Sequence, residues 1–215
     1  MAGKRLRIAV DCDEPLADCN TCLQAWHNRT YETNLTVDDI FSFKLWLVWE
    51  CSKEESDRRV YEFYESEDFR NMQPTPGAAE GVAAIAEDND PFVLTSRVGV
   101  AVPHTKPFTD RYYPGRFDKV VFSKNYALAG NGRSKADICV KEKADILIDD
   151  CLHYALDCQK KDIPVILFDR PWNRKRAMKE EGLHKLPSGI VRAKWDEIPE
   201  LTDILKHDKK EFYRL

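Results

Sequence analysis

The most informative part of the chain is the stretch Ile8-Ala9-Val10-Asp11-Cys12-Asp13-Glu14-Pro15-Leu16-Ala17-Asp18. An apolar run from Leu6 to Val10 ends there at two aspartates separated by one residue. A near-continuous apolar run of this length is typical of a strand that is buried on both faces. Carboxylates at the end of such a strand are costly, because they repel one another and prefer water to a medium of low dielectric constant. The stretch therefore predicts a buried strand that ends at a chemically active edge of a sheet.

Four further short apolar runs alternate with longer amphipathic stretches: Phe92–Leu94, Lys119–Phe122, Ile146–Ile148 and Val165–Phe168. This alternation predicts a three-layer α/β fold around a parallel sheet. In open α/β sheets, ligands bind at the carboxyl ends of the strands. We therefore expect one crevice to collect the residues that follow four of the five runs: Asp11-Cys12-Asp13, Thr95-Ser96-Arg97, Asp149-Asp150 and Asp169-Arg170.

The segment between the first and second runs has a different character, rich in aromatic and charged residues. Its spacing predicts helices over Asn20–Arg29, from Val37 through Trp49, and over Lys53–Glu65. The sequence Gln73-Pro74-Thr75-Pro76-Gly77 cannot continue a regular helix and returns the chain to the sheet. The sequence therefore predicts a core made of residues 1–18 and 76–215, with residues 19–75 inserted after the first strand as a small helical cap.

Composition narrows the classes of function. A chain of 215 residues with 33 basic and 37 acidic residues is sized for one domain and has a net charge of −4. Tight nucleic-acid binding is disfavoured, because neutralising backbone phosphates needs clustered Lys and Arg. No apolar run approaches the roughly 20 residues of a membrane span, and the first residues show no apolar signal segment. Seven cysteines, an odd number, fit reduced thiols. We expect a cytoplasmic protein that does not bind membranes; the oligomeric state is not predicted.

The aspartates after the first and fourth runs form a candidate metal site. Asp11, Asp13, Asp149 and Asp150 offer the hard oxygen ligands that Mg²⁺ prefers, while water and a substrate phosphate complete its coordination. The alternative is that these are surface carboxylates at strand ends. Two pairs after separate strands favour the metal site, because both strand ends meet in one crevice.

Four motifs carry a resemblance to a known family. The stretch 8–18 resembles the first motif of the haloacid dehalogenase superfamily, and its Asp-x-Asp form is similar to the phosphatase branch. Phe92–Arg97 resembles the second motif, Lys135 before an amphipathic helix the third, and Ile146–Asp150 the fourth. The Leu-Ala-Asp ending, the helical insert and the Thr-Ser pair most resemble the 5′(3′)-deoxyribonucleotidase-like group. The resemblance implies a Rossmann-like three-layer fold with a small cap after the first strand.

The resemblance also implies roles for individual residues. Asp11 would be the nucleophile that forms an aspartyl-phosphate, and Asp13 the general acid and base. Thr95, with Ser96 beside it, would hydrogen-bond a phosphate oxygen, and Lys135 would offset negative charge. Mg²⁺ would bind Asp11, the backbone carbonyl of Asp13, and one of the Asp149–Asp150 pair.

Some of these roles have alternatives. Thr95 or Ser96 could instead cap a helix N-terminus, although such a terminus also binds phosphate. Nearby lysines at positions 124, 141 and 143 compete with Lys135, which is favoured because it opens the helix-like segment 134–143 before the Asp149–Asp150 strand.

The substrate is predicted less directly. Most cap aromatics are expected to pack in a small core, but Trp46 or Trp49 could stack on a nucleotide base, and Arg97 could bind a second anionic group of the substrate. The predicted function is Mg²⁺-dependent hydrolysis of a phosphomonoester, a nucleoside monophosphate or a similar small phosphorylated metabolite. Glu14 and Pro15 depart from the family pattern of glycine followed by threonine or valine. A catalytically weak or inactive binding or regulatory protein is therefore the alternative, and repair of nucleic-acid ends is a weaker one.

Overall fold

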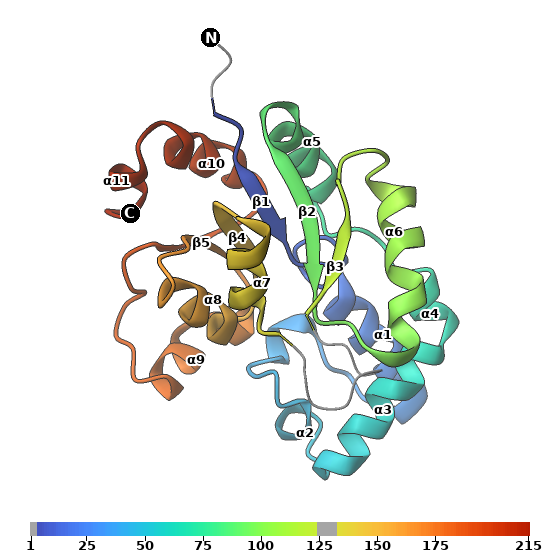
Figure 1. Ribbon diagram of the computed structural model, residues 1–215. Helices are drawn as coiled ribbons and strands as arrows, with labels where there is room; N and C mark the ends of the chain where they lie inside the picture. Colours follow the sequence, from blue (N-terminus) through green and yellow to red (C-terminus); the bar gives the residue numbers. More distant parts are fainter. Residues whose placement is uncertain (1–3, 124–132) are drawn as a thin grey trace.

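The computed structural model describes residues 4–123 and 133–215. Its centre is a parallel sheet with the strand order β3-β2-β1-β4-β5-β6 (Figure 1). The strands are β1 (Arg7–Val10), β2 (Asp90–Thr95), β3 (Val120–Phe122), β4 (Ile146–Asp149), β5 (Val165–Phe168) and β6 (Ile190–Ala193). The first five confirm the strands predicted from the sequence. The sixth was not predicted; it pairs in parallel with β5 and forms one edge of the sheet.

Helices cover both faces of the sheet, as a three-layer fold requires. One face packs against α5 (Ala78–Asp88), α6 (Thr105–Tyr112), α10 (Ile198–His207) and α11 (Lys209–Phe212). The other packs against α7 (Lys135–Glu142), α8 (Leu152–Gln159) and α9 (Lys175–Glu180). Adjacent strand residues divide between these two cores: Ile8 and Val10 of β1 belong to the first, and Ala9 to the second. This division follows from the alternation of side chains along a strand. The continuous apolar pattern of β1 is thus explained by burial on both faces.

The segment predicted to form the cap, residues 19–75, lies beyond the carboxyl ends of the central strands (Figure 1). It contains α1 (Cys19–Tyr31), α2 (Leu45–Val48), α3 (Lys53–Glu65), α4 (Glu67–Arg70) and the short 3-10 helix η1 (Val37–Asp39). Its small aromatic core includes Trp26, Phe63 and Phe69, whose rings pack in tilted and edge-on pairs. Ser52 starts α3 by accepting a hydrogen bond from the Glu55 amide at 3.1 Å.

The chain enters and leaves the cap along adjacent paths. The Asp18 amide donates to the Gln73 carbonyl at 3.0 Å, and the Thr75 amide donates to the Leu16 carbonyl at 2.9 Å. The prolines near position 75 therefore lie in the return path, where the sequence placed a break in helical structure. Among the described residues, no helix is long and apolar enough to cross a membrane.

Candidate active site

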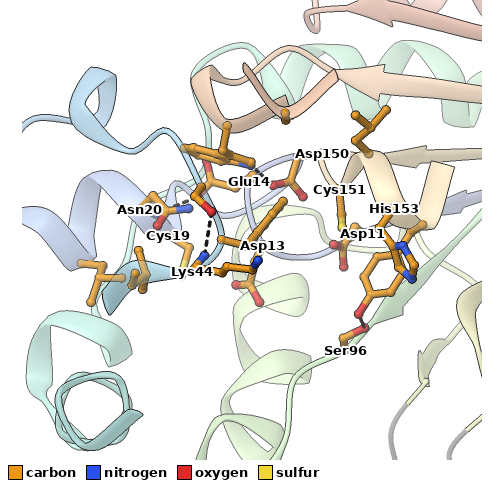
Figure 2. A pocket seen from close by; sticks show the side chains of 18 of the residues that line it. Asp11, Asp13, Glu14, Cys19, Asn20, Lys44, Ser96, Asp150, Cys151 and His153 are labelled. Atoms are coloured by element: carbon orange, nitrogen blue, oxygen red, sulfur yellow. Dashed lines mark hydrogen bonds between the residues drawn. The ribbon is translucent and has the colours of Figure 1, made fainter. Parts of the chain in front are cut away.

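The strand order brings the motif residues together. Strand β1 lies between β2 and β4, so the residues that follow these three strands share one edge of the sheet. A cavity of about 560 Å³ opens there, beneath the cap. Its polar lining includes Asp11, Asp13, Glu14, Ser96 and Asp150, which Figure 2 shows around the pocket. Residues from three of the four predicted strand ends therefore share one crevice, and Asp169 and Arg170 do not line it.

Lys135 connects two of the carboxylates at the floor of this site. It is the first residue of α7, and its ammonium lies 2.6 Å from Asp11 Oδ2 and 2.7 Å from Asp149 Oδ2. Only 1% of its side chain is exposed. Burial opposes its charge, but the two carboxylates outweigh burial and raise the pKa of Lys135 well above its usual value. A charged amine therefore contacts Asp11. Of the lysines that the sequence offered as alternatives to Lys135, the one at position 124 lies outside the described residues.

Asp11 is held in place at both of its carboxylate oxygens. The Cys12 amide donates to Oδ1 at 2.8 Å, and Oδ2 contacts Lys135. Burial raises the pKa of Asp11 to about 7, with the charges of Asp149 and Asp13 adding to the rise and Lys135 opposing it. One lysine therefore does not fully compensate the negative charge of this cluster, and a bound cation would favour the ionised carboxylate.

Three buried carboxylates could hold that cation. Ligand oxygens of Asp11, Asp149 and Asp150 all lie within 4.8 Å of one another. Burial, then the charges of Asp149 and Asp11, raise the pKa of Asp150 well above its usual value. Clustered oxygen donors that repel one another are the donor set that suits Mg²⁺. The residues present therefore fit a divalent metal.

Asp149 and Asp150 differ in how much of each carboxylate remains available. Asp149 uses Oδ1 to accept from the Cys151 amide at 2.8 Å and Oδ2 to accept from Lys135. Asp150 accepts from Trp172 Nε1 through Oδ2 at 2.7 Å, and its Oδ1 has no donor among the described residues. Asp150 also lines the cavity. Of these two aspartates, Asp150 therefore has the carboxylate oxygen that is less engaged by the described residues.

Asp13 and Arg97 form an ion pair, which the sequence did not predict. Arg97 Nη2 lies 2.6 Å from Asp13 Oδ1, and Arg97 Nε lies 3.1 Å from both carboxylate oxygens. Arg97 is buried, with 1% of its side chain exposed. Arg97 lines the cavity, where the sequence predicted it to bind a second anionic group of the substrate, and its guanidinium already contacts Asp13.

The two residues of the Thr-Ser pair lie in different surroundings: Thr95 is in the interior and Ser96 is at the pocket. Thr95 is fully buried and accepts from the Arg97 amide through Oγ1 at 3.2 Å. Ser96 lines the cavity, and its hydroxyl shares a hydrogen bond of 2.8 Å with Ser123 Oγ. The next helix, η2 (Gly99–His104), is preceded by Val98, so neither residue acts as its N-cap. Of this pair, Ser96 is therefore the residue that lines the cavity.

Both tryptophans proposed for base stacking lie outside the pocket. Trp49 is buried, stacks on His27 with ring centroids 4.4 Å apart, and donates from Nε1 to Gln24 Oε1 at 3.3 Å. Trp46 also does not line the cavity. The structure therefore does not bring these two residues to the cavity that contains Asp11 and Asp13. The aromatic rings that line the cavity among the described residues are Phe41, Phe43, Phe63, Tyr64, Tyr154 and Trp172, together with the imidazole of His153.

Glu14 is a pocket residue whose role the sequence did not reveal. Its backbone has a φ of 77°, in the left-handed region, and its side chain is buried. The carboxylate accepts from Arg170 Nε at 2.6 Å and from the Asn20 amide at 2.7 Å. Burial raises the pKa of Glu14 to about 7, although Arg170 opposes this rise. The sequence signal that could have indicated this role was the replacement of the family's glycine by Glu14. Glu14 keeps a backbone conformation that favours glycine, and its side chain adds the ion pair with Arg170.

The comparisons with known proteins agree with this fold. The model of the family described as "5′ nucleotidase, deoxy (Pyrimidine), cytosolic type C protein" matches residues 5–196. A search of the curated proteins found no match.

Several solved structures share the fold at low sequence identity. A haloacid dehalogenase-like hydrolase from Streptococcus pneumoniae is 12% identical, with a TM-score of 0.65 over 92% of this chain and 98% of that one. A haloacid dehalogenase-like protein from Agrobacterium tumefaciens is 12% identical, with a TM-score of 0.65 over 94% and 99%. A HAD family hydrolase from Deinococcus radiodurans, solved with bound phosphate and sodium, is 12% identical, with a TM-score of 0.58 over 96% and 98%.

Proposed function

Because the chain belongs to the cytosolic type C family of 5′-nucleotidases, we propose that it is a Mg²⁺-dependent phosphomonoesterase that acts on nucleoside monophosphates through an aspartyl-phosphate. The observation that carries this proposal is the contact of Asp11 with Lys135 at 2.6 Å, in the pocket that also contains Asp13. The contact supplies an oriented carboxylate nucleophile and a cation beside it. The carboxyl group of Asp13, two residues after Asp11, would donate and accept the proton. We also propose a cytoplasmic location.

The proposed reaction has two steps. Asp11 Oδ attacks phosphorus while the ester P–O bond breaks, and the carboxyl group of Asp13 gives its proton to the departing oxygen. Water then attacks phosphorus while the Asp11–phosphorus bond breaks, and Asp13 takes the proton of the water. Lys135 offsets charge on Asp11 and on the transferring group. A divalent ion held by Asp11, Asp150 and the Asp13 carbonyl would supply further positive charge between two anionic reactants.

The cavity supports a small phosphorylated substrate with a planar group. Its volume of about 560 Å³ lies in the usual range for small-molecule sites. Phe43, 53% exposed, stands at the pocket with its ring edge-on to Trp172 at 6.0 Å. An exposed ring at a pocket wall can stack on a nucleobase. We therefore propose that Phe43, rather than either cap tryptophan, contacts the base.

The test is phosphate release from nucleoside monophosphates, sugar phosphates and an aryl phosphate, with Mg²⁺ or with EDTA. We expect release from nucleoside monophosphates in Mg²⁺ only, and loss of at least a thousandfold in Asp11→Asn. Asp118→Asn is the matched control, since Asp118 pairs with Arg7 on the surface. A folded wild-type protein that releases no phosphate from any substrate would contradict the proposal and favour a binding protein. Equal release in EDTA would contradict the metal requirement.

A further inference from the structure

Arg97 is a buried cation with a restricted set of partners. Asp13 is the one carboxylate within 4.0 Å of its guanidinium among residues 4–123 and 133–215. The Phe69 ring lies over the guanidinium with its centroid 4.9 Å away, and the Phe108 ring lies 5.9 Å away. Thr105 Oγ1 is 3.5 Å from Nη1, at the limit of a hydrogen bond. The two rings and the single carboxylate therefore fix the orientation of this side chain.

The two carboxylate oxygens of Asp13 have different numbers of hydrogen bonds to Arg97. Oδ1 accepts from Nη2 at 2.6 Å and from Nε at 3.1 Å, whereas Oδ2 accepts only from Nε at 3.1 Å. The Asp13 side chain is 31% exposed and lines the cavity. The guanidinium thus fixes the plane of the carboxyl group while leaving Oδ2 the less engaged oxygen. The less engaged oxygen, Oδ2, is therefore the one available to a group in the pocket.

We propose that Arg97 is the positioning residue that holds Asp13 for proton transfer to the leaving group. This inference rests on the proposed function, because it assigns a task within the proposed reaction. Arg97 does not exchange a proton itself. The proton moves from Asp13 to the ester oxygen as its bond to phosphorus breaks, and Arg97 keeps the carboxyl group in the orientation that this transfer needs. Precise orientation of a general acid accounts for a large part of its contribution to the rate.

Phe69 extends this arrangement into the cap. It belongs to α4, is buried, and packs against Phe63 at 5.5 Å and Tyr64 at 5.1 Å, both on α3. The aromatic core of the cap therefore rests directly on the guanidinium that holds Asp13. An aromatic face attracts a cation in addition to excluding water from it. Replacing the ring with an aliphatic side chain should weaken the hold on Arg97 without removing any charged group.

The test compares two leaving groups in single-turnover reactions. A nucleoside leaves as an alkoxide and needs a proton, whereas 4-nitrophenol leaves as a stable anion and does not. Release of the nucleoside or the nitrophenol reports formation of the aspartyl-phosphate alone. We expect Arg97→Met to slow nucleoside release by about 100-fold and nitrophenol release by less than fivefold, with KM unchanged within threefold. Asp13→Asn should show the same dependence on the leaving group.

Three further variants separate positioning from other roles. Arg97→Lys keeps the charge but loses the planar fork, so we expect a partial rescue of nucleoside release. Phe69→Leu should give a smaller loss with the same leaving-group dependence. Arg111→Met is the matched control; this exposed arginine lies over Tyr112, makes no contact with Asp13, and should behave as wild type. If Arg97→Met does not fold, as judged by thermal melting, Arg97→Lys and Phe69→Leu provide the same comparison.

The possible outcomes are distinct. Equal losses for both leaving groups would overturn the inference and leave Arg97 a structural residue. A tenfold rise in KM with unchanged single-turnover rates would also overturn it, because Arg97 would then bind the substrate. In both cases an active wild type would leave the proposed function intact. A wild type inactive on both esters would overturn the proposed function, and this inference with it.

Discussion

The indole N–H of Trp172 donates to Asp150 Oδ2 at 2.7 Å, and both side chains are buried. Trp172 belongs to η3 (Pro171–Asn173), the turn that follows β5. Asn173 in the same turn donates to the Asp150 carbonyl at 2.8 Å. The turn after β5 therefore fixes both the backbone and the carboxylate of Asp150. If Asp150 binds the proposed metal, these partners orient the ligand, and such contacts are worth about 10- to 100-fold in metal affinity.

We therefore predict that Trp172→Phe weakens Mg²⁺ binding by about tenfold. The substitution keeps an aromatic ring but removes the donor to Asp150. The measurement is Mg²⁺ titration by calorimetry, together with the Mg²⁺ concentration that gives half-maximal activity. Trp49→Phe is the control, because it removes an indole hydrogen bond of 3.3 Å to Gln24 inside the cap. Equal Mg²⁺ affinity in wild type and Trp172→Phe would show that this bond does not orient the metal site.

A second prediction concerns Glu14, which combines backbone strain with a buried ion pair. Glu14→Gly relieves a left-handed conformation that costs roughly 1–2 kcal/mol. It also leaves Arg170, 17% exposed at its side chain, without its carboxylate partner. Breaking a buried pair by removing one partner costs about 3–5 kcal/mol. Because the loss exceeds the relief, we expect Glu14→Gly to lower the free energy of unfolding by roughly 1–4 kcal/mol.

The control for this prediction is the double variant Glu14→Gly with Arg170→Met, measured by urea unfolding. Removing both charges eliminates the uncompensated guanidinium, so the double variant should be more stable than Glu14→Gly alone. If Glu14→Gly by itself is more stable than the wild type, relief of backbone strain contributes more free energy than the Glu14–Arg170 pair, and the prediction is wrong.

A third prediction concerns the pH dependence of stability through His27. This residue is fully buried, its Nδ1 is 2.8 Å from Thr33 Oγ1, and its Nε2 accepts from Arg59 Nη1 at 3.0 Å. Burial, with the charge of Arg59 adding to it, lowers the pKa of His27 to about 4. The unfolded chain, with a histidine pKa near 6.5, therefore binds more protons between pH 4 and 6.5. This contribution to stability is complete above pH 6.5 and is lost as the pH falls toward 4.

The size of the effect is bounded by one proton, or about 1.4 kcal/mol per pH unit. His27→Gln should unfold with a shallower pH dependence between pH 6.5 and 4.5, and the difference from wild type isolates His27 from the carboxylates that titrate in the same range. Urea unfolding at five pH values makes the comparison. Parallel pH profiles for the two proteins would contradict a neutral buried His27.

A fourth prediction tests Phe43 as the base contact. Phe43→Ala should raise KM for nucleoside monophosphates by about tenfold, since stacking contributes roughly 1–3 kcal/mol per base. KM for a small phosphate without a ring should stay unchanged. Tyr61→Ala is the matched control, because Tyr61 is 50% exposed and does not line the cavity. A uniform rise in KM for all phosphates would place the role of Phe43 elsewhere.

Much of the sheet was predictable because burial on both faces leaves a continuous apolar pattern. Strand β6 escaped prediction because its four residues, Ile190–Ala193, include an arginine and occupy an edge position. The crevice was predictable because parallel strands place their carboxyl ends on one side. The sheet and the meeting of the motifs at its carboxyl edge could therefore be predicted from the sequence.

The details of the site depended on contacts between distant segments. Asp13 and Arg97 are 84 positions apart, and Glu14 and Arg170 are 156 apart. No local pattern assigns such partners, although a charged residue beside a buried strand implies that one exists. Trp49 and Phe43 show a similar limit, because two aromatic residues in one short segment can face opposite directions.

The adjacent entry and exit of the cap have a consequence for how such proteins diversify. Leu16 and Thr75 are joined by a backbone hydrogen bond of 2.9 Å, so the two covalent connections between the inserted segment and the sheet lie side by side. A segment attached in this way can lengthen, shorten or be replaced without changing the pairing of any strand. Changes in this segment can therefore alter which molecules enter the pocket while Asp11, Lys135 and Asp150 keep their positions.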